Sequence, residues 1–481
     1  MLSPIDISIV AVYFCAVIGI GIWAARRDGG REDFLVAGRS IPGWAVLGSL
    51  VATEVSAATF LAVPGVGFSE NFNYLQFGIG SIIARFFVAY VFVSVFYGAG
   101  CLSIYEYLGK RFGVRSQKLG SVLFILTRLM ASGVRLLIAA TGVSVILDIS
   151  FVICLVLFCI LALVYTGLGG IRSVIWTDCL QALVFITAGV AALVFLLSQI
   201  GVGAFFETAH EAGRLEVFRL RPSELGWLGW LKDGNVLWLA MVFGFIQTTA
   251  SLGTDHDLTQ RLLTAKSAAQ AKLSLIISGF IAVPIAALFL MVGTGLFVWM
   301  QTGNAEPLTM ISGSDKAFPT FIRELAPIGL KGLLLAGVVA AAMSSLDSAM
   351  AALSSSASVD LIKPKEGALK QSCWITVVFA AVLGLVAYFL GKTGDQFLWL
   401  AFQISSVTYG ALLGVFLLGL LTRSRGSDIG NIFGASLSLL ITTTLLVFIK
   451  TDVIALGWTW LIVIGTFTSF CGGTVFKKAE A

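Results

Sequence analysis

The sequence is dominated by apolar stretches of helical length that recur from one end to the other. The hydrocarbon core of a bilayer is about 30 Å thick and needs roughly 20 apolar residues per helix. Only 12% of the residues are charged, against roughly 25% in soluble proteins. The sequence therefore predicts an all-α integral membrane protein that leaves no room for a separate soluble domain. About thirteen transmembrane helices are expected, over residues 5–24, 43–66, 74–100, 119–147, 150–168, 173–200, 233–255, 270–300, 329–358, 371–391, 395–421, 428–449 and 453–475.

Lys and Arg residues divide unevenly between the two sides of these helices. With the N-terminus outside, nineteen fall on one side and nine on the other. Six of the nine lie in the two long loops, 201–232 and 301–328, where charge is a weaker guide to orientation. Because cytoplasmic loops carry the excess of basic residues, we predict an external N-terminus and a cytoplasmic C-terminus, in a bacterial inner membrane. The basic residues sit in short loops, so the net charge of +5 predicts no nucleic-acid partner.

Two of the predicted helices carry polar residues in mid-span. They are residues 52–59 (ATEVSAAT) in the second helix and 247–254 (QTTASLGT) in the seventh, five helices later. Backbone groups freed from a helix at membrane depth are tolerated only where they line a cavity or bind something. A pair of interrupted helices in two halves of a chain indicates a transporter binding site at the bilayer midplane.

Six Asp, Glu or Arg residues fall in the interior of the predicted helices, more than three residues from either end. Each costs about 2.5–3.5 kcal/mol on insertion scales, so each must face a partner, water or a cargo path. A structural ion pair and a functional role are both open for any one of them, since three acids and three arginines can pair off completely. The six are Glu54, Arg85, Arg128, Arg135, Asp178 and Asp347.

The ninth helix contains a run of hydroxyl residues around a carboxylate. Ser344, Asp347 and Ser348 share one helix face, because they are spaced three and four residues apart. Ser345 is turned about 100° onto the neighbouring flank. Oxygen ligands on one face suit a hard cation, and no soft ligand for a transition metal is present. Close helix packing by small residues is the alternative reading, and the carboxylate favours an ion site.

These features together resemble the sodium:solute symporter family, over nearly the whole chain. The resemblance is carried by residues 52–56 (ATEVS), 165–171 (YTGLGGI), 174–178 (VIWTD), 260–263 (QRLL) with 265–266 (AK), 344–348 (SSLDS) and 410–423. It implies a LeuT-like fold of two inverted five-helix repeats, at about 43–200 and 233–421. The helices at 5–24, 428–449 and 453–475 would flank these repeats, and all would form one transporter domain.

The resemblance also implies sites for sodium as the coupling ion, with no organic cofactor. Sodium site one would comprise the carbonyls of Ala52, Val55 and Ala341 with the hydroxyls of Ser344 and Ser345. A second sodium site, found in some members, would comprise Asp178, Ser344, Asp347 and Ser348. Asp347 stands where those members have a hydroxyl residue. The extra carboxylate would either tighten sodium binding or accept a proton.

The solute is expected beside the interrupted helices. Ser56 and Thr59 match polar substrate positions of the sialic acid branch, whereas Glu54 replaces a neutral residue and disfavours an anionic solute. Arg128 or Arg135 would either neutralise Glu54 or hold a solute carboxylate. A sugar, a sialic acid-like solute or another carboxylated or polyhydroxylated metabolite is the expected class. The candidate solute-binding residues are Glu54, Ser56, Thr59, Gln76, Arg135, Gln247, Ser251, Gln403 and Tyr409.

A sodium-coupled symporter that works by alternating access as a monomer is therefore the favoured hypothesis. Proton coupling through Glu54 or Asp347 is an alternative, and an ion channel is a further one. A membrane enzyme is disfavoured, because no His lies inside the predicted helices. His210 and His256 are expected on solvated loops.

Overall fold

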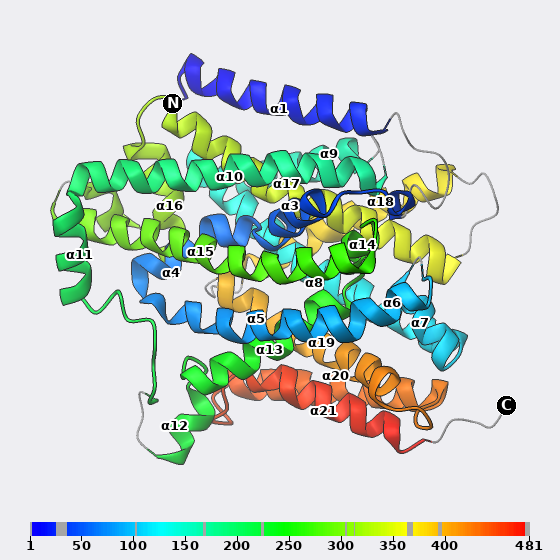
Figure 1. Ribbon diagram of the computed structural model, residues 1–481. Coiled ribbons are helices and arrows are strands. Elements are labelled where there is room, and N and C mark those ends of the chain that lie inside the picture. Colours follow the sequence, from blue (N-terminus) through cyan, green and yellow to red (C-terminus); the bar gives the residue numbers. More distant parts are fainter. Residues whose placement is uncertain are drawn as a thin grey trace.

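The computed structural model describes residues 2–25, 36–101, 103–166, 170–222, 226–303, 305–311, 313–362, 369–392 and 397–476. These residues form a bundle of long helices that run in roughly common directions (Figure 1). Outside the described residues lie 26–35 and 363–368, which include some of the basic residues used to predict the orientation in the membrane. Residues 167–169 of the YTGLGGI motif lie outside them too.

The α-helices of the described part are α1 (Pro4–Ala25), α3 (Gly43–Glu54), α4 (Val63–Ser69), α5 (Gln76–Phe87), α6 (Ser94–Gly98), α7 (Ile104–Arg111), α8 (Val114–Leu147), α9 (Phe151–Thr166), α10 (Ile171–Ile200), α11 (Val202–Glu211), α12 (Trp227–Lys232), α13 (Leu237–Thr254), α14 (His256–Leu263), α15 (Ala268–Gln301), α16 (Ala317–Thr320), α17 (Leu330–Ser356), α18 (Leu369–Leu390), α19 (Phe397–Leu421), α20 (Asp428–Lys450) and α21 (Trp460–Thr474). Short 3-10 or π-helical segments join or extend them at η1 (Ala37–Arg39), η2 (Ala58–Ala62), η3 (Phe72–Leu75), η4 (Val88–Val93), η5 (Glu306–Met310), η6 (Ser314–Lys316), η7 (Phe321–Leu325) and η8 (Ala357–Ile362).

The helices account for every predicted transmembrane segment. Nine described helices are long and apolar enough to cross a bilayer, and the bent pair Gly43–Glu54 and Ala58–Ser69 makes a tenth candidate. Three shorter apolar helices, Phe151–Leu163, Trp374–Leu390 and Trp460–Thr474, lie where the remaining segments were predicted. The prediction of an all-helical membrane protein is confirmed, and the division into inverted repeats stays a prediction.

The interruption of the second predicted helix is confirmed. α3 and the helix from Ala58 onward meet at an angle of 56°. Val55 leaves the helical conformation at φ −83° and ψ 84°. The interruption predicted within residues 247–254 is wrong, because α13 is continuous to Thr254 and the chain turns at Asp255 instead. Four polar side chains of this stretch, those of Gln247, Thr248, Ser251 and Thr254, donate within the helix or to neighbouring helices, as in the 2.7 Å bond from Thr254 Oγ1 to the carbonyl oxygen of Ala250.

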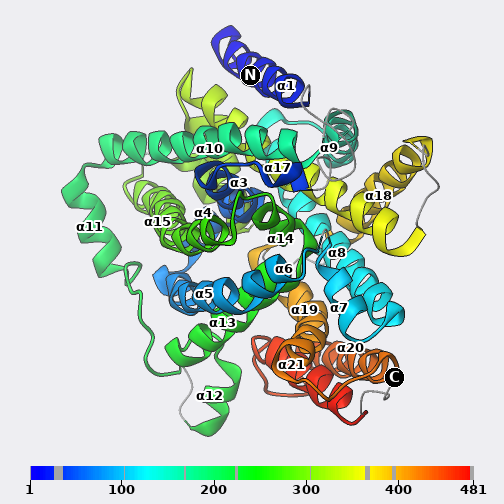
Figure 2. The same ribbon diagram turned by 45° about the vertical axis from the view of Figure 1, so that its right-hand side comes forward.

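α17 lies at the centre of the bundle. Within its most apolar stretch 94% of the residues are buried, against 22% for α1 and for α20. α1 runs along the outside of the bundle, and α20 and α21 lie at the opposite edge (Figures 1 and 2). α17 packs between α10 and α8, and also contacts the end of α3. A central helix whose neighbours all bury it is a suitable place for polar residues, since none of them need face lipid.

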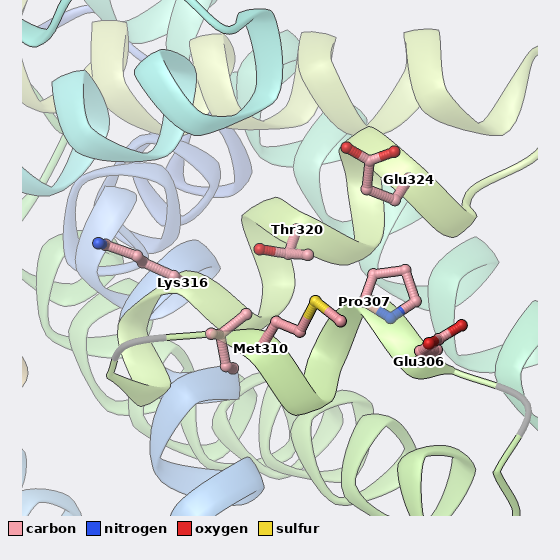
Figure 3. Close-up of a pocket in the computed structure, with 7 residues that line it drawn as sticks. Glu306, Pro307, Met310, Lys316, Thr320 and Glu324 are labelled. Carbon is pink, nitrogen blue, oxygen red and sulfur yellow. The ribbon is translucent and has the colours of Figure 1, made fainter.

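A hollow of about 560 Å³ opens at the loop that follows α15. Its lining residues are Glu306, Pro307, Met310, Ile311, Lys316, Thr320 and Glu324 (Figure 3). None of the residues predicted to bind sodium or solute lines it. The candidate site therefore has to be sought among the buried polar groups inside the bundle.

Candidate functional site

The break after α3 frees a backbone carbonyl in the middle of the bundle. In a continuous helix the N–H of Ser56 would bond to the carbonyl oxygen of Ala52. Here that N–H donates to the carbonyl oxygen of Glu54 at 3.1 Å. The hydroxyl of Ser344, on α17, donates to the Ala52 carbonyl oxygen instead, also at 3.1 Å. The break thus turns a main-chain oxygen of α3 toward the serine-rich face of α17.

The Ala341 carbonyl and the Ser345 hydroxyl, also predicted for sodium site one, lie beside Ser344 on α17. The hydroxyls of Ser344 and Ser345 are each 3.3 Å from the carbonyl oxygen of Ala341, and both serines are fully buried. Val55, within the break, is also buried. Carbonyls of an unwound helix together with hydroxyls are suitable donors for Na⁺. The bond from Ser344 to Ala52 thus brings oxygens of α3 and α17 together.

The second predicted sodium site also contains the side chain of Arg261, which was not among its predicted residues. Asp178, on α10, accepts hydrogen bonds from Ser49 Oγ at 2.6 Å and from Arg261 Nη2 at 3.2 Å. Arg261 Nη2 also donates to Ser348 Oγ at 2.5 Å. A resident guanidinium therefore bridges two of the predicted ligands. Asp347 is buried beside them, and its Oδ1 has no hydrogen-bond partner among the described residues.

Two residues between the seventh and eighth predicted helices are buried, although His256 was expected on a solvated loop. Arg261 has no exposed surface, and His256 is 1% exposed, with its ring 6.0 Å from those of Tyr105 and Phe124. The reason is that residues 256–263 form a second helix, α14, that packs inside the bundle. The signals in the sequence were Asp255, whose side chain caps α14 by accepting the N–H of Asp257 at 2.9 Å, and the four-residue spacing of Asp257 and Arg261.

The sequence allowed the six charged residues inside the helices to form three ion pairs with one another. The structure does not show this arrangement. Only Glu54 and Arg85 pair with each other. Arg128 pairs with Asp257 and, at 3.5 Å, with Asp255, both at the start of α14. Asp178 pairs with Arg261. Among the described residues, Nη1 of Arg135 and Oδ1 of Asp347 are left buried without a hydrogen-bond partner.

Three of the predicted solute-binding residues keep a buried polar atom without a partner in the described part of the chain. They are Nη1 of Arg135 on α8, Oε1 of Gln247 on α13 and Oε1 of Gln403 on α19. Gln247 is held by a 3.0 Å bond from its Nε2 to Ser405 Oγ on α19. Arg135 lies within electrostatic reach of Tyr409 and Asp255. Buried polar atoms normally find a partner, so these three atoms are available to a polar ligand.

The remaining solute candidates have partners within the protein. Tyr409 donates to Asp255 Oδ2 at 2.6 Å, and Ser251 donates to the carbonyl oxygen of Thr248 at 3.3 Å. Ser56 Oγ accepts the N–H of Ala58, and Thr59 is half-buried on η2. The amide of Gln76 is fully buried and bonds to the backbone of Asn73, Asn235 and Arg219. Gln76 therefore joins loop segments in this structure and offers no free donor.

Comparison with known proteins decides the family. Residues 34–436 match the profile of the sodium:solute symporter family. The chain belongs to this family. The symporter is 27% identical to a sodium/sialic acid symporter of Aliivibrio fischeri over 429 residues, which cover 86% of this chain and 83% of that protein. It is 28% identical to a sodium/glucose cotransporter of Vibrio parahaemolyticus over 463 residues, which cover 89% and 83% of the two chains.

Solved structures establish the fold of the symporter. A substrate-bound, outward-open Na⁺-coupled sialic acid symporter superposes with a TM-score of 0.84 at 24% identity, covering 98% of this chain and 97% of the other. The nucleobase-cation-symport-1 transporter Mhp1, closed around a bound hydantoin, gives 0.60 at 13% identity, with 92% and 93% covered. The predicted LeuT-like fold is confirmed. The symporter is a sodium-coupled solute transporter and not an enzyme.

Proposed function

We propose that this symporter imports a small solute bearing a carboxylate and hydroxyl or amine groups. The observation that carries the proposal is the buried, unpartnered Nη1 of Arg135 on α8, together with the unpartnered amide oxygens of Gln247 on α13 and Gln403 on α19. A guanidinium binds carboxylates through charge-assisted hydrogen bonds. The two amide oxygens need donors, which hydroxyl or amine groups supply. Glu54, which disfavours an anion on sequence grounds, is neutralised by Arg85.

Sodium is proposed to bind first, between the break and α17. There it would replace the hydrogen bonds that the Ser344 and Ser345 hydroxyls now make to main-chain oxygens. By joining α3 to α17 it would hold the state in which the solute site is complete. Asp178, Asp347 and Ser348, with Ser344, are the proposed residues of a second sodium site, where the free Oδ1 of Asp347 is the available ligand.

Release into the cytoplasm would follow when the helices around α17 move relative to α3. Oxygens from two separately moving helices form a site only while the helices stay together. A cytoplasm poor in sodium then empties the site, and the solute leaves. An inside-negative potential adds about 2.3 kcal/mol per charge per 100 mV to the driving force.

The test is a thermal-shift screen of the purified full-length protein, with and without sodium. Sugars, amino acids, hydroxy acids and sialic acids form the panel, because a ligand stabilises the state that it binds. We expect carboxylated, hydroxylated compounds to raise the melting temperature, and to do so more strongly in sodium. Stabilisation by neutral sugars alone would contradict the proposed class. Uptake into proteoliposomes driven by a pH gradient in sodium-free buffer would contradict sodium coupling.

A further inference from the structure

We infer that Arg85 is a positioning residue for the coupling ion, which acts through Glu54 to hold the end of α3 where its carbonyls face α17. This inference rests on the proposed sodium site. Glu54 is the last residue of α3, and its carboxylate forms an ion pair with the guanidinium of Arg85 on α5. The exposed fractions of the two side chains are 17% and 3%.

Arg85 is itself held by three further groups. Its Nε donates to Ser278 Oγ, on α15, at 3.2 Å. Its Nη1 donates to the carbonyl oxygen of Ser81 at 3.3 Å and to the Ser81 hydroxyl. The same hydroxyl accepts a 2.8 Å bond from Thr248 Oγ1 on α13. The guanidinium therefore joins the end of α3 to α5, α13 and α15, and it does so through directional bonds that specify an orientation.

The neighbouring helix leaves room for this guanidinium at a glycine. A Cβ on Gly279, one residue after Ser278, would lie 2.6 Å from Arg85 Cδ and 3.1 Å from its Nε. Any side chain at that position would displace the arginine. Because α15 passes so close, the Ser278 hydroxyl also lies 3.4 Å from Glu54 Oε1. The carboxylate is thus held on two sides, by a charge and by a hydroxyl.

The orientation of Glu54 matters because the break begins at this residue. Its own carbonyl oxygen accepts the N–H of Ser56, and this bond leaves the Ala52 oxygen free for Ser344. Val55, the proposed sodium ligand, follows directly and has no helical conformation to constrain it. Rotation of the chain at Glu54 would turn the main-chain oxygens of Ala52 and Val55 away from α17. The ion pair opposes that rotation by holding the Glu54 side chain against α5 and α15.

A purely structural role would have a different consequence. Removing one partner of a buried pair leaves an uncompensated charge and destabilises the folded protein. That loss lowers the melting temperature whether or not sodium is bound. A positioning role predicts in addition a weaker response to sodium, while the solute site, on α8, α13 and α19, keeps its affinity once sodium is saturating.

The experiment compares Arg85→Gln, Glu54→Gln and Arg85→Lys with the unmodified full-length protein in detergent. Two quantities are measured: the NaCl concentration that gives half of the maximal thermal stabilisation, and the solute KM in proteoliposomes at saturating sodium. We expect both Gln variants to raise the half-maximal NaCl concentration about tenfold, as removal of an outer-sphere partner does at metal sites. Arg85→Lys keeps the positive charge but loses the planar guanidinium group. Its half-maximal NaCl concentration should lie between those of the Gln variants and that of the unmodified protein. The solute KM of the two Arg85 variants should change less than about twofold.

Asp360→Asn is the matched control. Its carboxylate is buried and accepts bonds from Ser103, Gln117 and Ser356, but it does not touch α3. This variant should lose stability without a change in sodium response. Variants of Glu54 and Arg85 that melt at a lower temperature with the sodium response intact would overturn the inference. If Arg85→Gln does not fold, the Arg85→Lys result decides. If the unmodified protein shows no stabilisation by sodium, the proposed function fails instead.

Discussion

Arg135 and Asp347 differ from the other charged residues inside the bundle. Arg128, Arg261, Asp178 and their partners are held in ion pairs with almost no exposed surface. Arg135 Nη1 and Asp347 Oδ1 are buried without hydrogen-bond partners in the described structure. An unpaired buried polar group costs free energy unless something binds it. A protein that carries an anion together with a cation needs a cationic group for the first and an anionic group for the second. Arg135 and Asp347 are suited to these two roles.

Replacing Arg135 tests the solute side. Arg135→Gln should raise the KM for a carboxylated solute at least about tenfold, because hydrogen bonds to charged groups contribute about 1.5–3 kcal/mol. Arg135→Lys keeps the charge and should lose less. Uptake assays in proteoliposomes measure KM, and the sodium concentration for half-maximal uptake should stay unchanged. An unaltered KM in Arg135→Gln would show that Arg135 does not bind the solute.

Replacing Ser345 tests sodium site one. Ser345→Ala deletes one hydroxyl ligand and should raise the sodium concentration for half-maximal uptake about tenfold, in line with the loss of one buried polar interaction. The matched control is Ser355→Ala on the same helix, whose buried hydroxyl has no partner among the described residues and lies beyond the proposed ligands. If Ser345→Ala and Asp178→Ala both leave the sodium dependence unchanged, the assignment of the ion sites is wrong.

Asp315, in the loop before α16, provides a pH-dependent contribution to stability. Burial raises its pKa from 3.8 to about 6, although its Oδ2 accepts the N–H of Phe397 at 3.1 Å. The folded protein therefore binds a proton that the unfolded chain releases between pH values of about 4 and 6, and stability falls as pH rises through this window. The melting temperature of the unmodified protein relative to Asp315→Asn should decline across that window. A constant difference would refute this.

At the scale of whole elements, the sequence predicted one helix break correctly and misplaced the other. Residues 52–59 combine a carboxylate with small and hydroxyl residues, and the chain does bend there. Residues 247–254 looked similar, yet Thr248 and Gln247 bond to Ser81 and Ser405 on neighbouring helices, so α13 has no need to break. Composition cannot tell a polar residue that bonds across helices from one that unwinds its own helix.

The candidate site, too, could be predicted only in part from the sequence. The serines of α17 were predictable, because their spacing on one helix is local information. The bridge from Arg261 to Asp178 and Ser348 was not, since it joins residues 83 and 87 positions apart. It also depends on α14 folding into the bundle, although α14 resembles a charged loop in sequence. Long-range packing of this kind is set by tertiary contacts that periodicity does not reveal.

Glycine contacts between α5 and α13 make a prediction about helix packing. A Cβ on Gly244 would lie 2.2 Å from the carbonyl oxygen of Phe77, and one on Gly80 would lie 2.0 Å from that of Met241. Small residues allow membrane helices to approach this closely. Gly244→Leu should therefore prevent the two helices from packing and abolish a cooperative melting transition. Gly19→Leu, on α1, where a Cβ would meet no atom within 4 Å, should melt like the unmodified protein.

At the scale of the molecule, the proposed sites determine the charge that one transport cycle moves. Site one uses only neutral carbonyls and hydroxyls, so its sodium ion carries a full positive charge across the bilayer. A carboxylate held by Arg135 cancels that charge. A second sodium at Asp178 and Asp347 would leave one net positive charge per cycle, if both binding residues return unchanged. For a solute whose only charge is this carboxylate, the response of uptake to membrane potential therefore reports the number of sodium ions.

We expect two sodium ions per carboxylate, because Asp347 supplies a carboxylate oxygen that no described residue uses. An inside-negative potential of 100 mV, imposed with potassium and valinomycin, should then favour accumulation by about 2.3 kcal/mol, or roughly fiftyfold. Asp347→Asn should weaken the second sodium and reduce the cooperativity of uptake with sodium concentration. Uptake that does not respond to the imposed potential would mean that one sodium ion is carried per carboxylated solute. Asp347 would then have no part in coupling, and the assignment of site one would stand.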